Sequence, residues 1–395
     1  MERKGNANLN ERKREIEMKT LSAISIGVMA CLAIGITTAR GQVMYSLEDL
    51  GVVKDMEWSV PAAINSQGYV TGTAYKGEET CAFHYDFLKK FMEDAGGFNS
   101  RGFGINSLSV VVGDNFPVGP MEPRSHAAIF KGGVVTDLGV LPGQVYSRAN
   151  GINAIGQVVG YSGLQRDSFE SRAFMWSNQT GMIDIGTLGG GYAQAYAIND
   201  GGFITGASQT RGLSPVAMTH AFIYRPVPGM GPMPSEPMRD LGVLGGFSSY
   251  GMAINNYSHV VGYSTINTID ERVHAFFHDG NRMIDLGSLG AKGYRWGSDV
   301  SVALGINNFD QVVGYSYLPA VGGMPIQQVA FLWTRTSVTT GGKMVNLNKL
   351  VVNGTNYLLT SATGINDNGQ IVASAYDLQN GGVHAVLLTP IPPSW

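Results

Sequence analysis

Short runs of alternating apolar and small residues recur along most of the chain, and each run ends in an Ile-Asn pair or a close variant of it. In residues 151–162, the pair Ile152-Asn153 is followed by a turn around Gly156 and by a second apolar run that begins at Val158. An alternation with a period of two predicts a β-strand, and Asn and Gly favour the left-handed backbone conformations of tight hairpin turns. Each copy therefore predicts a β-hairpin.

The hairpin recurs at a spacing that is typical of the blades of a β-propeller. Seven copies are marked by their asparagines: Asn65, Asn106, Asn153, Asn199, Asn255, Asn307 and Asn366. Successive asparagines lie 41, 47, 46, 56, 52 and 59 residues apart, which is the length of one four-stranded blade. The pattern predicts an all-β repeat protein of seven units.

Two further strands complete each unit. The third strand contains an Ala-Phe pair, as at Ala173-Phe174, and the fourth ends in Asp-Leu-Gly, as at residues 285–287. The first strand carries small residues at alternate positions, such as Ser147, Ala149 and Gly151. Small side chains clear one face of a strand, which is needed where several sheets crowd around an axis. We therefore expect the first strand of each unit to be the innermost.

The two ends of the repeat region complement each other. Residues 45–51 have the pattern of a fourth strand without its unit, and residues 384–389 have that of a third strand with no fourth strand after it. We predict a seven-bladed β-propeller of four-stranded blades, in which the N-terminal strand closes the last blade and hides the sheet edges. An open β-solenoid or an array of β-sandwiches is the alternative, although an open solenoid has no use for such ends.

The first 41 residues differ from the rest of the chain. Residues 1–20 are charged, residues 21–39 form an apolar run, and small residues flank Arg40. This order is typical of a secretory signal peptide that is removed, whether translation starts at Met1 or at Met18. We expect residues 42–395 to form a single extracellular or periplasmic domain, with 390–395 as a short tail. An uncleaved membrane anchor is the rival interpretation, because an apolar run of about 19 residues can span a bilayer.

Charge and cysteine content narrow the choice of partners. The chain has 27 basic and 30 acidic residues, and removal of the leader's seven basic and four acidic residues leaves 20 and 26, a net charge near −6. This balance favours neither nucleic acid nor an anionic membrane as a partner. Cys81 would be the one cysteine left, so no disulfide can form within the mature chain. We expect a monomer that is stabilised by packing.

The same residues carry a family resemblance. The His-Ala-Phe triplets at 220–222 and 274–276, the Asp-Leu-Gly strand ends, the Leu-Gly-Gly turns at 188–190 and 244–246, and the Gly-Ile-Asn segments together resemble the HAF-repeat family of bacterial extracellular proteins. The resemblance covers residues 45–389. It implies an exported repeat protein with no established activity.

Residues that recur in every unit are interpreted as structural. The seven asparagines fit Asx turns. His126, His220, His274 and His384 each begin a third strand, and we expect them to hydrogen-bond neighbouring carboxylates such as Asp137, Asp240 and Asp285.

The sequence does not predict a metal, a cofactor or an enzyme active site. His84, His259 and His278 lie outside the recurring set, and none has a Cys, His or carboxylate at metal-ligand spacing. The chain also lacks a P-loop, an H-E-x-x-H zinc motif and a G-x-S-x-G nucleophile elbow. We therefore expect no cofactor, no metal and no catalytic residue.

Variable loops supply the candidate ligand-binding residues. In a propeller, the connections from the second to the third strand and from the fourth strand to the next unit emerge on one face, and in this chain they are the longer ones. Aromatic and polar groups on such a face suit a carbohydrate or an extended peptide, because flat rings stack on sugars or pack apolar side chains. The alternative interpretation places one aromatic per unit in the seam between blades. The candidate set is Trp58, Tyr146, Tyr192, Tyr250, Tyr294, Arg295, Trp296, Asp299 and Tyr357.

Three functions compete at this point. The leading hypothesis is a secreted, non-enzymatic binding or structural propeller that recognises a glycan or a surface protein. A passive matrix protein without a ligand is another possibility. The enzyme alternative is a polysaccharide lyase or glycoside hydrolase whose acid and base come from the loops, with the candidates Asp167, Glu170, Asp270, Glu271 and Asp299.

Overall fold

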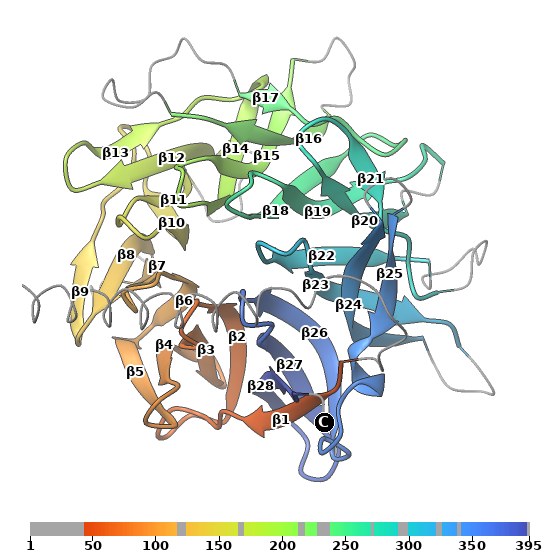
Figure 1. The fold of residues 1–395 in the computed structure, drawn as a ribbon. Coiled ribbons are helices and arrows are strands. Elements are labelled where there is room, and N and C mark those ends of the chain that lie inside the picture. Colours follow the sequence, from red (N-terminus) through yellow and green to blue (C-terminus); the bar gives the residue numbers. More distant parts are fainter. Residues whose placement is uncertain are drawn as a thin grey trace, which may run out of the picture. The chain divides into compact units, whose positions relative to one another are not determined.

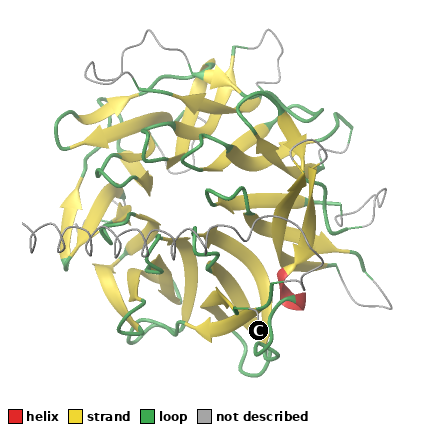
Figure 2. Ribbon diagram, viewed as in Figure 1, coloured by secondary structure: helices red, strands yellow, loops and turns green. Residues whose placement is uncertain are grey.

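The computed structural model describes residues 43–116, 124–164, 170–211, 218–226, 238–269, 272–290, 299–320, 326–337 and 341–392. The chain divides into two units, Met1–Val43 and Met44–Trp395, and the predicted signal peptide lies outside the described residues. The second unit is a seven-bladed β-propeller (Figure 1). Its described part consists of strands and loops with one short 3-10 helix, η1 (Leu347–Lys349), which is red in Figure 2.

Each blade is one four-stranded antiparallel sheet, whose strands we call A to D from the innermost to the outermost. Blade 1 contains β2 (Trp58–Ile64), β3 (Val70–Lys76), β4 (Glu79–Asp86) and β5 (Phe91–Phe98). Blade 2 contains β6 (Ser100–Ile105), β7 (Val111–Asn115), β8 (His126–Lys131) and β9 (Val134–Asp137). Blade 3 contains β10 (Tyr146–Ile152), β11 (Val158–Gly163), β12 (Arg172–Ser177) and β13 (Gly181–Asp184).

Blade 4 contains β14 (Gly189–Ile198), β15 (Ile204–Thr210), β16 (Thr219–Tyr224) and β17 (Arg239–Asp240). Blade 5 contains β18 (Ser249–Ile254), β19 (Val260–Thr265), β20 (Val273–His278) and β21 (Met283–Asp285). Blade 6 contains β22 (Ser301–Ile306), β23 (Val312–Leu318), β24 (Gln327–Ser337) and β25 (Gly341–Asn346). Blade 7 combines β26 (Tyr357–Ile365), β27 (Ile371–Asp377) and β28 (Val383–Pro390) with β1 (Tyr45–Asp49).

Both ends of the propeller meet in blade 7, as the sequence predicts. Strand β1 pairs antiparallel with β28, from Tyr45 opposite Pro390 to Asp49 opposite Val386. Pro390, the first residue of the predicted tail, thus belongs to a strand, and the backbone of Ile391 donates a hydrogen bond to that of Met44. Because β1 is the outer strand of blade 7, the two ends of the propeller close the ring within one sheet.

The antiparallel order gives the propeller two different faces. The A–B and C–D turns lie on one face, which we call the A–B face, and the B–C and D–A connections lie on the opposite B–C face. The phenylalanine of each Ala-Phe pair lies between these faces in the core, and Phe83, Phe174 and Phe222 are each 0% exposed. The loops on the two faces therefore stand on a rigid scaffold.

Small residues on the inner strands are required by close backbone contact between blades. A Cβ atom on Gly104 would lie 2.9 Å from the carbonyl oxygen of Asn150, and one on Gly305 would lie 3.1 Å from the Cα of Gly364. Every inner strand also has a register irregularity at the same place. The residue skipped there is not uniformly small, as Phe103 and Tyr196 show, because a bulged residue has no cross-strand partner to limit its size. This skipped residue lies between the alternate positions at which the sequence predicts small side chains, as Asn150 lies between Ala149 and Gly151.

The recurring asparagines form a closed ring of hydrogen bonds between blades. Asn65 Oδ1 accepts hydrogen bonds from the backbone N–H groups of Gln67 and Tyr69, which is the expected Asx turn. Its Nδ2 donates to the backbone carbonyl of Asn106 in the next blade, at 3.0 Å. The same inter-blade bond links all seven asparagines, and Asn366 closes the ring by donating to the carbonyl of Asn65. Each asparagine therefore stabilises its own turn and also forms a hydrogen bond to the next blade.

A serine at the start of strand A forms a second link between blades. Ser147 Oγ accepts a hydrogen bond from the N–H of Ala127 and donates one to the carbonyl of Gly139, both in blade 2. Equivalent pairs of bonds are made by Ser59, Ser100, Ser249 and Ser301. At these five seams, the serine links strand C to the end of strand D of the neighbouring blade.

Candidate functional site

Trp58 is the most exposed of the predicted ligand-binding residues that the structure describes. It begins β2 on the B–C face, and 52% of its surface is exposed. Its indole lies against Gly382 in the B–C turn of blade 7: a Cβ atom on Gly382 would be 3.5 Å from Trp58 Cδ1. Gly382 has a φ of +95°, a conformation that L residues rarely adopt. The turn therefore supports one side of the indole and leaves much of the ring open.

A polar group lies beside Trp58 where blade 7 meets blade 1. Asp49 Oδ2 accepts hydrogen bonds from the Tyr357 hydroxyl and from His384 Nδ1, each at 2.8 Å. Burial and the carboxylate of Asp49 raise the pKa of Tyr357 to about 12, so its hydroxyl stays protonated. We call Trp58, Asp49, Tyr357, Gly382 and His384 the Trp58 cluster. It joins a flat apolar ring to fixed polar groups.

The B–C turn that supports Trp58 is held by Asp377. This carboxylate accepts hydrogen bonds from Asn380 Nδ2 and from the backbone N–H groups of Gln379 and Asn380. These bonds, with that of the Asn380 side chain the largest, lower the pKa of Asp377. The turn thus presents the exposed side chains of Gln379 and Tyr376, the latter 44% exposed, in a fixed arrangement.

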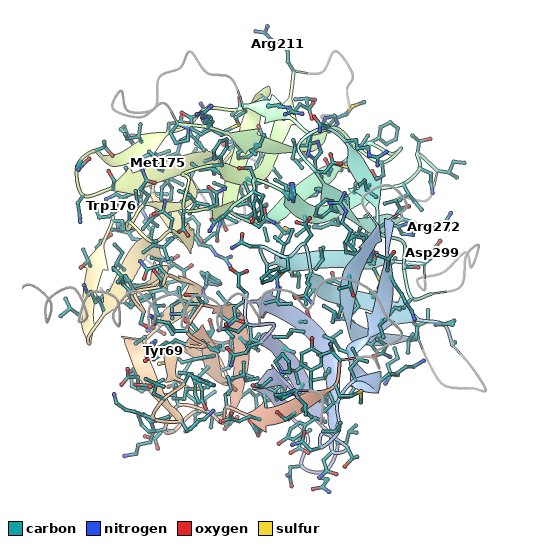
Figure 3. The ribbon with its side chains drawn as sticks, viewed as in Figure 1. Tyr69, Met175, Trp176, Arg211, Arg272 and Asp299 are labelled. Carbon is teal, nitrogen blue, oxygen red and sulfur yellow. The ribbon has the colours of Figure 1, made fainter. Side chains whose placement is uncertain are left out.

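A second group of charges lies on the same face at blades 5 and 6. His274 Nδ1 contacts Asp285 at 2.9 Å, and His274 Nε2 contacts Asp299 Oδ1 at 3.0 Å. Asp299 Oδ2 also accepts from Arg272 at 2.7 Å, and Figure 3 shows these two side chains together at the rim. Ser288 donates to Asp299 Oδ1 as well. We call these residues the His274 network. It borders a cleft of about 590 Å³.

The arrangement of the His274 network favours a positioning role over catalysis. Asp299 is 4% exposed, and both of its oxygens accept hydrogen bonds from side chains. Burial lowers the pKa of His274, but the hydrogen bonds and charges of Asp285 and Asp299 outweigh burial, so the pKa lies above its ordinary value. A carboxylate that is bound in this way holds an imidazolium in place.

We expect substitution of Asp299 to change how stability depends on pH. Because folding raises the pKa of His274, its contribution is complete below the unfolded pKa of about 6.5 and is lost as the pH rises through the folded value. Asp299→Asn should lower the free energy of unfolding by about 3 kcal/mol at pH 6, with a smaller loss at pH 9. Urea unfolding at both pH values measures this. The matched control is Asp137→Asn, which changes a histidine pair with a single carboxylate; an equal pH dependence in the two variants would contradict the account.

Tyr146, Tyr192 and Tyr250 do not join the Trp58 cluster. Tyr146 is 4% exposed, so its ring is packed inside the protein. Tyr192 and Tyr250 are half-buried, and Tyr250 stacks on Tyr263 with ring centroids 4.8 Å apart. Tyr294, Arg295 and Trp296 lie outside the described residues. Of the predicted residues that the structure describes, it brings together Trp58 and Tyr357.

The structure places the predicted acids in different settings. Glu170 is exposed, and Asp299 belongs to the His274 network. Asp167, Asp270 and Glu271 lie outside the described residues. Sequence reasoning did not predict Asp49 as a site residue. Its partners Tyr357 and His384 are 308 and 335 residues away, so the sequence indicated only that Asp49 belongs to the first strand.

The predicted histidine pairs are confirmed. His126, His220 and His274 contact Asp137, Asp240 and Asp285 at 2.8–2.9 Å, and His384 contacts Asp49 in the same way. His84 and His259 also have carboxylate partners, Glu93 and Asp310, which spacing alone did not reveal. Over the residues described, no three His, Cys, Asp or Glu side chains are grouped as metal ligands.

The fold and the Trp58 cluster define a seven-bladed β-propeller with an aromatic and polar patch on one face. Residues 191–382 match a family model described as "Protein of unknown function (DUF3466)". A search of the curated proteins found no match. No helix in the described part of the chain has the length and apolar character of a membrane span.

Among solved structures, the chain is similar to the acylaminoacyl peptidase of Pyrococcus horikoshii in its orthorhombic crystal form, with a TM-score of 0.48 and 9% identity over 86% of this chain and 53% of the peptidase. It is also similar to an acylaminoacyl peptidase in complex with Z-Gly-Gly-Phe-chloromethyl ketone, with a TM-score of 0.49 and 9% identity over 85% of this chain and 52% of that one. The chain spans about half the length of each peptidase.

Proposed function

We propose that this protein is a secreted, non-enzymatic carbohydrate-binding propeller of the HAF-repeat type, and that the Trp58 cluster is part of its ligand site. One observation carries the proposal: an indole that is 52% exposed lies on a fixed turn, beside a tyrosine hydroxyl and an imidazole that are held by a common carboxylate. An exposed flat ring stacks on the apolar face of a sugar, and the neighbouring polar groups hydrogen-bond its hydroxyls.

The bonding of Asp49 supports binding over hydrolysis at this cluster. Glycoside hydrolysis usually needs two carboxyl groups that face the scissile bond, one of them free to move a proton. Asp49 Oδ1 accepts from the backbone N–H of Gly51, and Oδ2 accepts from Tyr357 and His384. The carboxylate therefore orients the two side chains that would contact a sugar.

A glycan array tests this proposal. The purified protein should bind a subset of glycans. Trp58→Ala should weaken that binding more than tenfold, which corresponds to about 1.4 kcal/mol, because it removes both the stacking contact and the apolar area that the indole buries against the sugar. Tyr257→Ala is the matched control, since Tyr257 is also an exposed aromatic, at 68%, but lies in an A–B turn on the opposite face.

Each other result would overturn the proposal. An absence of glycan binding, or equal binding by Trp58→Ala and the unchanged protein, would exclude the Trp58 cluster as a sugar site. Shortened glycans after incubation would indicate a lyase or hydrolase. Binding to a surface protein that Trp58→Ala abolishes, in the absence of glycan binding, would assign the face to protein recognition.

A further inference from the structure

An apolar groove crosses the A–B face between blades 2 and 3. Its volume is about 620 Å³, within the usual range for ligand sites of about 300–1,000 Å³. Leu108 and Ile155 border it at the tips of the two A–B turns, Val134 borders it at the outer strand, and all three are more than 60% exposed. Ile129 and Trp176 also belong to the apolar lining. The groove is independent of the Trp58 cluster, which lies on the other face.

The groove results from a difference in sequence at this seam. The fourth residue after the recurring asparagine is Val110 in blade 2, and this residue lines the groove. At the same position, Tyr69 stacks on His84 and His259 packs edge-on against Phe277, with ring centroids 5.5 and 5.2 Å apart. Valine has no ring to occupy this space, so the seam stays open.

The outer strand that borders the groove has a free edge. All four residues of β9 are exposed, and they include two adjacent valines, Val134 and Val135. Outer strands are commonly protected by charge, short length or a covering segment. The outer side of β1, for comparison, forms backbone hydrogen bonds at Tyr45, whose N–H donates to Leu350 and whose carbonyl accepts from Val352. Within the described part of the chain, nothing pairs with the outer side of β9.

The register of β9 fixes which backbone groups point outward. The N–H of Leu138 donates to the carbonyl of Ala127 at 2.8 Å, so these two residues form a hydrogen-bonded pair. Hydrogen-bonded and non-hydrogen-bonded pairs alternate along an antiparallel ladder. Phe130 and Val135 are therefore a non-hydrogen-bonded pair, and the N–H and C=O of Val135 point to the free edge. Val134 and Thr136, on the other side of the pleat, line the groove.

The positive charge of Lys131 at the groove favours an acidic partner. Lys131 is exposed and is the one charged side chain in the lining. No carboxylate among the described residues lies within ion-pair distance of it. A ligand that fills this groove can therefore place a carboxylate against Lys131 at its rim.

We propose that β9 and this groove dock an extended acidic segment of a partner protein, which adds to β9 as a further strand. Only an extended polypeptide uses both the unpaired backbone groups of Val135 and the apolar groove beside them. Its alternate side chains would enter the groove between Leu108, Ile155 and Trp176, and an Asp or Glu would face Lys131. This interaction is a second one, separate from the carbohydrate binding proposed above.

Selection from a random 12-residue peptide display library tests the proposal. We expect enriched peptides with alternating apolar residues and at least one acidic residue. Val135→Pro removes the outward N–H and leaves the β8–β9 ladder intact, so it should weaken binding of the enriched peptides more than tenfold. Val135→Ala keeps the N–H, so its affinity for the enriched peptides should be within about twofold of that of the unchanged protein.

Two further variants separate strand pairing from loss of folding. Ile155→Glu, at a residue that is 76% exposed, should also weaken peptide binding more than tenfold without lowering the melting temperature, because it places negative charge in the groove. Phe309→Glu, at the equivalent turn tip of blade 6, should have no effect. Enrichment of no peptide, or of peptides that tolerate Val135→Pro and Ile155→Glu, would overturn the proposal. A dimer in light scattering that Val135→Pro dissociates would also overturn it, by assigning the edge to a second copy of this chain.

Discussion

Asn65→Ala should lower the free energy of unfolding by about 3 kcal/mol, because a buried polar group that loses its partner costs about 1–3 kcal/mol and this substitution leaves three such groups. The side chain is 5% exposed and holds the N–H groups of Gln67 and Tyr69 as well as the carbonyl of Asn106. Chemical denaturation at neutral pH measures the change.

Asn65→Asp divides this effect into its two parts. An ionised Asp keeps the two acceptor bonds of the turn but has no N–H to donate to the carbonyl of Asn106. It should therefore lose the inter-blade bond alone and place a negative oxygen against a carbonyl oxygen. If the ring of asparagines fastens the blades, Asn65→Asp will be strongly destabilising. The control is Asn281→Ala, at an exposed turn residue. A stability of Asn65→Asp equal to that of the control would show that the inter-blade bond contributes nothing.

Much of the fold could be predicted because its signals are local. A hairpin is encoded within about twelve residues by alternation and an Asn-Gly turn, and the Asp-Leu-Gly and His-Ala-Phe motifs are close enough in sequence for their pairing to be proposed. The unmatched end strands then indicated closure. In contrast, the bond from Asn65 to Asn106 crosses 41 residues, and an Asx turn already explained the asparagine fully. The second role of this side chain was therefore missed.

In the candidate sites, too, local features could be predicted from the sequence and long-range contacts could not. Trp58 and Tyr357 could be singled out as aromatics in D–A connections, but the carboxylate between Tyr357 and His384 comes from Asp49, 308 residues from Tyr357. Only the closed ring brings them together. The groove between blades 2 and 3 was missed because it depends on a side chain that is small: Val110 leaves space where Tyr69, Phe203 and His259 have rings in blades 1, 4 and 5. A single repeat gives no sign of this, and only an alignment of the seven repeats would.

The Trp58 cluster can form only if β1 closes the ring. Asp49 belongs to β1, and it reaches Tyr357 and His384 only if β1 lies beside β28 in blade 7. Ser46 and Thr389 are directly opposite in this pairing, and Ser46 Oγ already donates to the carbonyl of Thr389. Opposed residues of this kind have Cα atoms about 5.5 Å apart, which is within the range of Cα separations that disulfides join.

The paired substitutions Ser46→Cys and Thr389→Cys should therefore give a disulfide that joins residues 343 positions apart. Such a long loop restricts the unfolded chain strongly, so the oxidised protein should gain up to ~5 kcal/mol of stability over the reduced protein. The single Ser46→Cys variant should show no such gain.

Mass spectrometry of the oxidised, protease-digested double variant is the most direct measurement. We expect a cross-linked peptide that joins Cys at 46 to Cys at 389 in nearly every molecule, formed without denaturant. Free thiols at both positions in the folded protein, or a cross-link only between different molecules, would show that the two ends do not share a sheet.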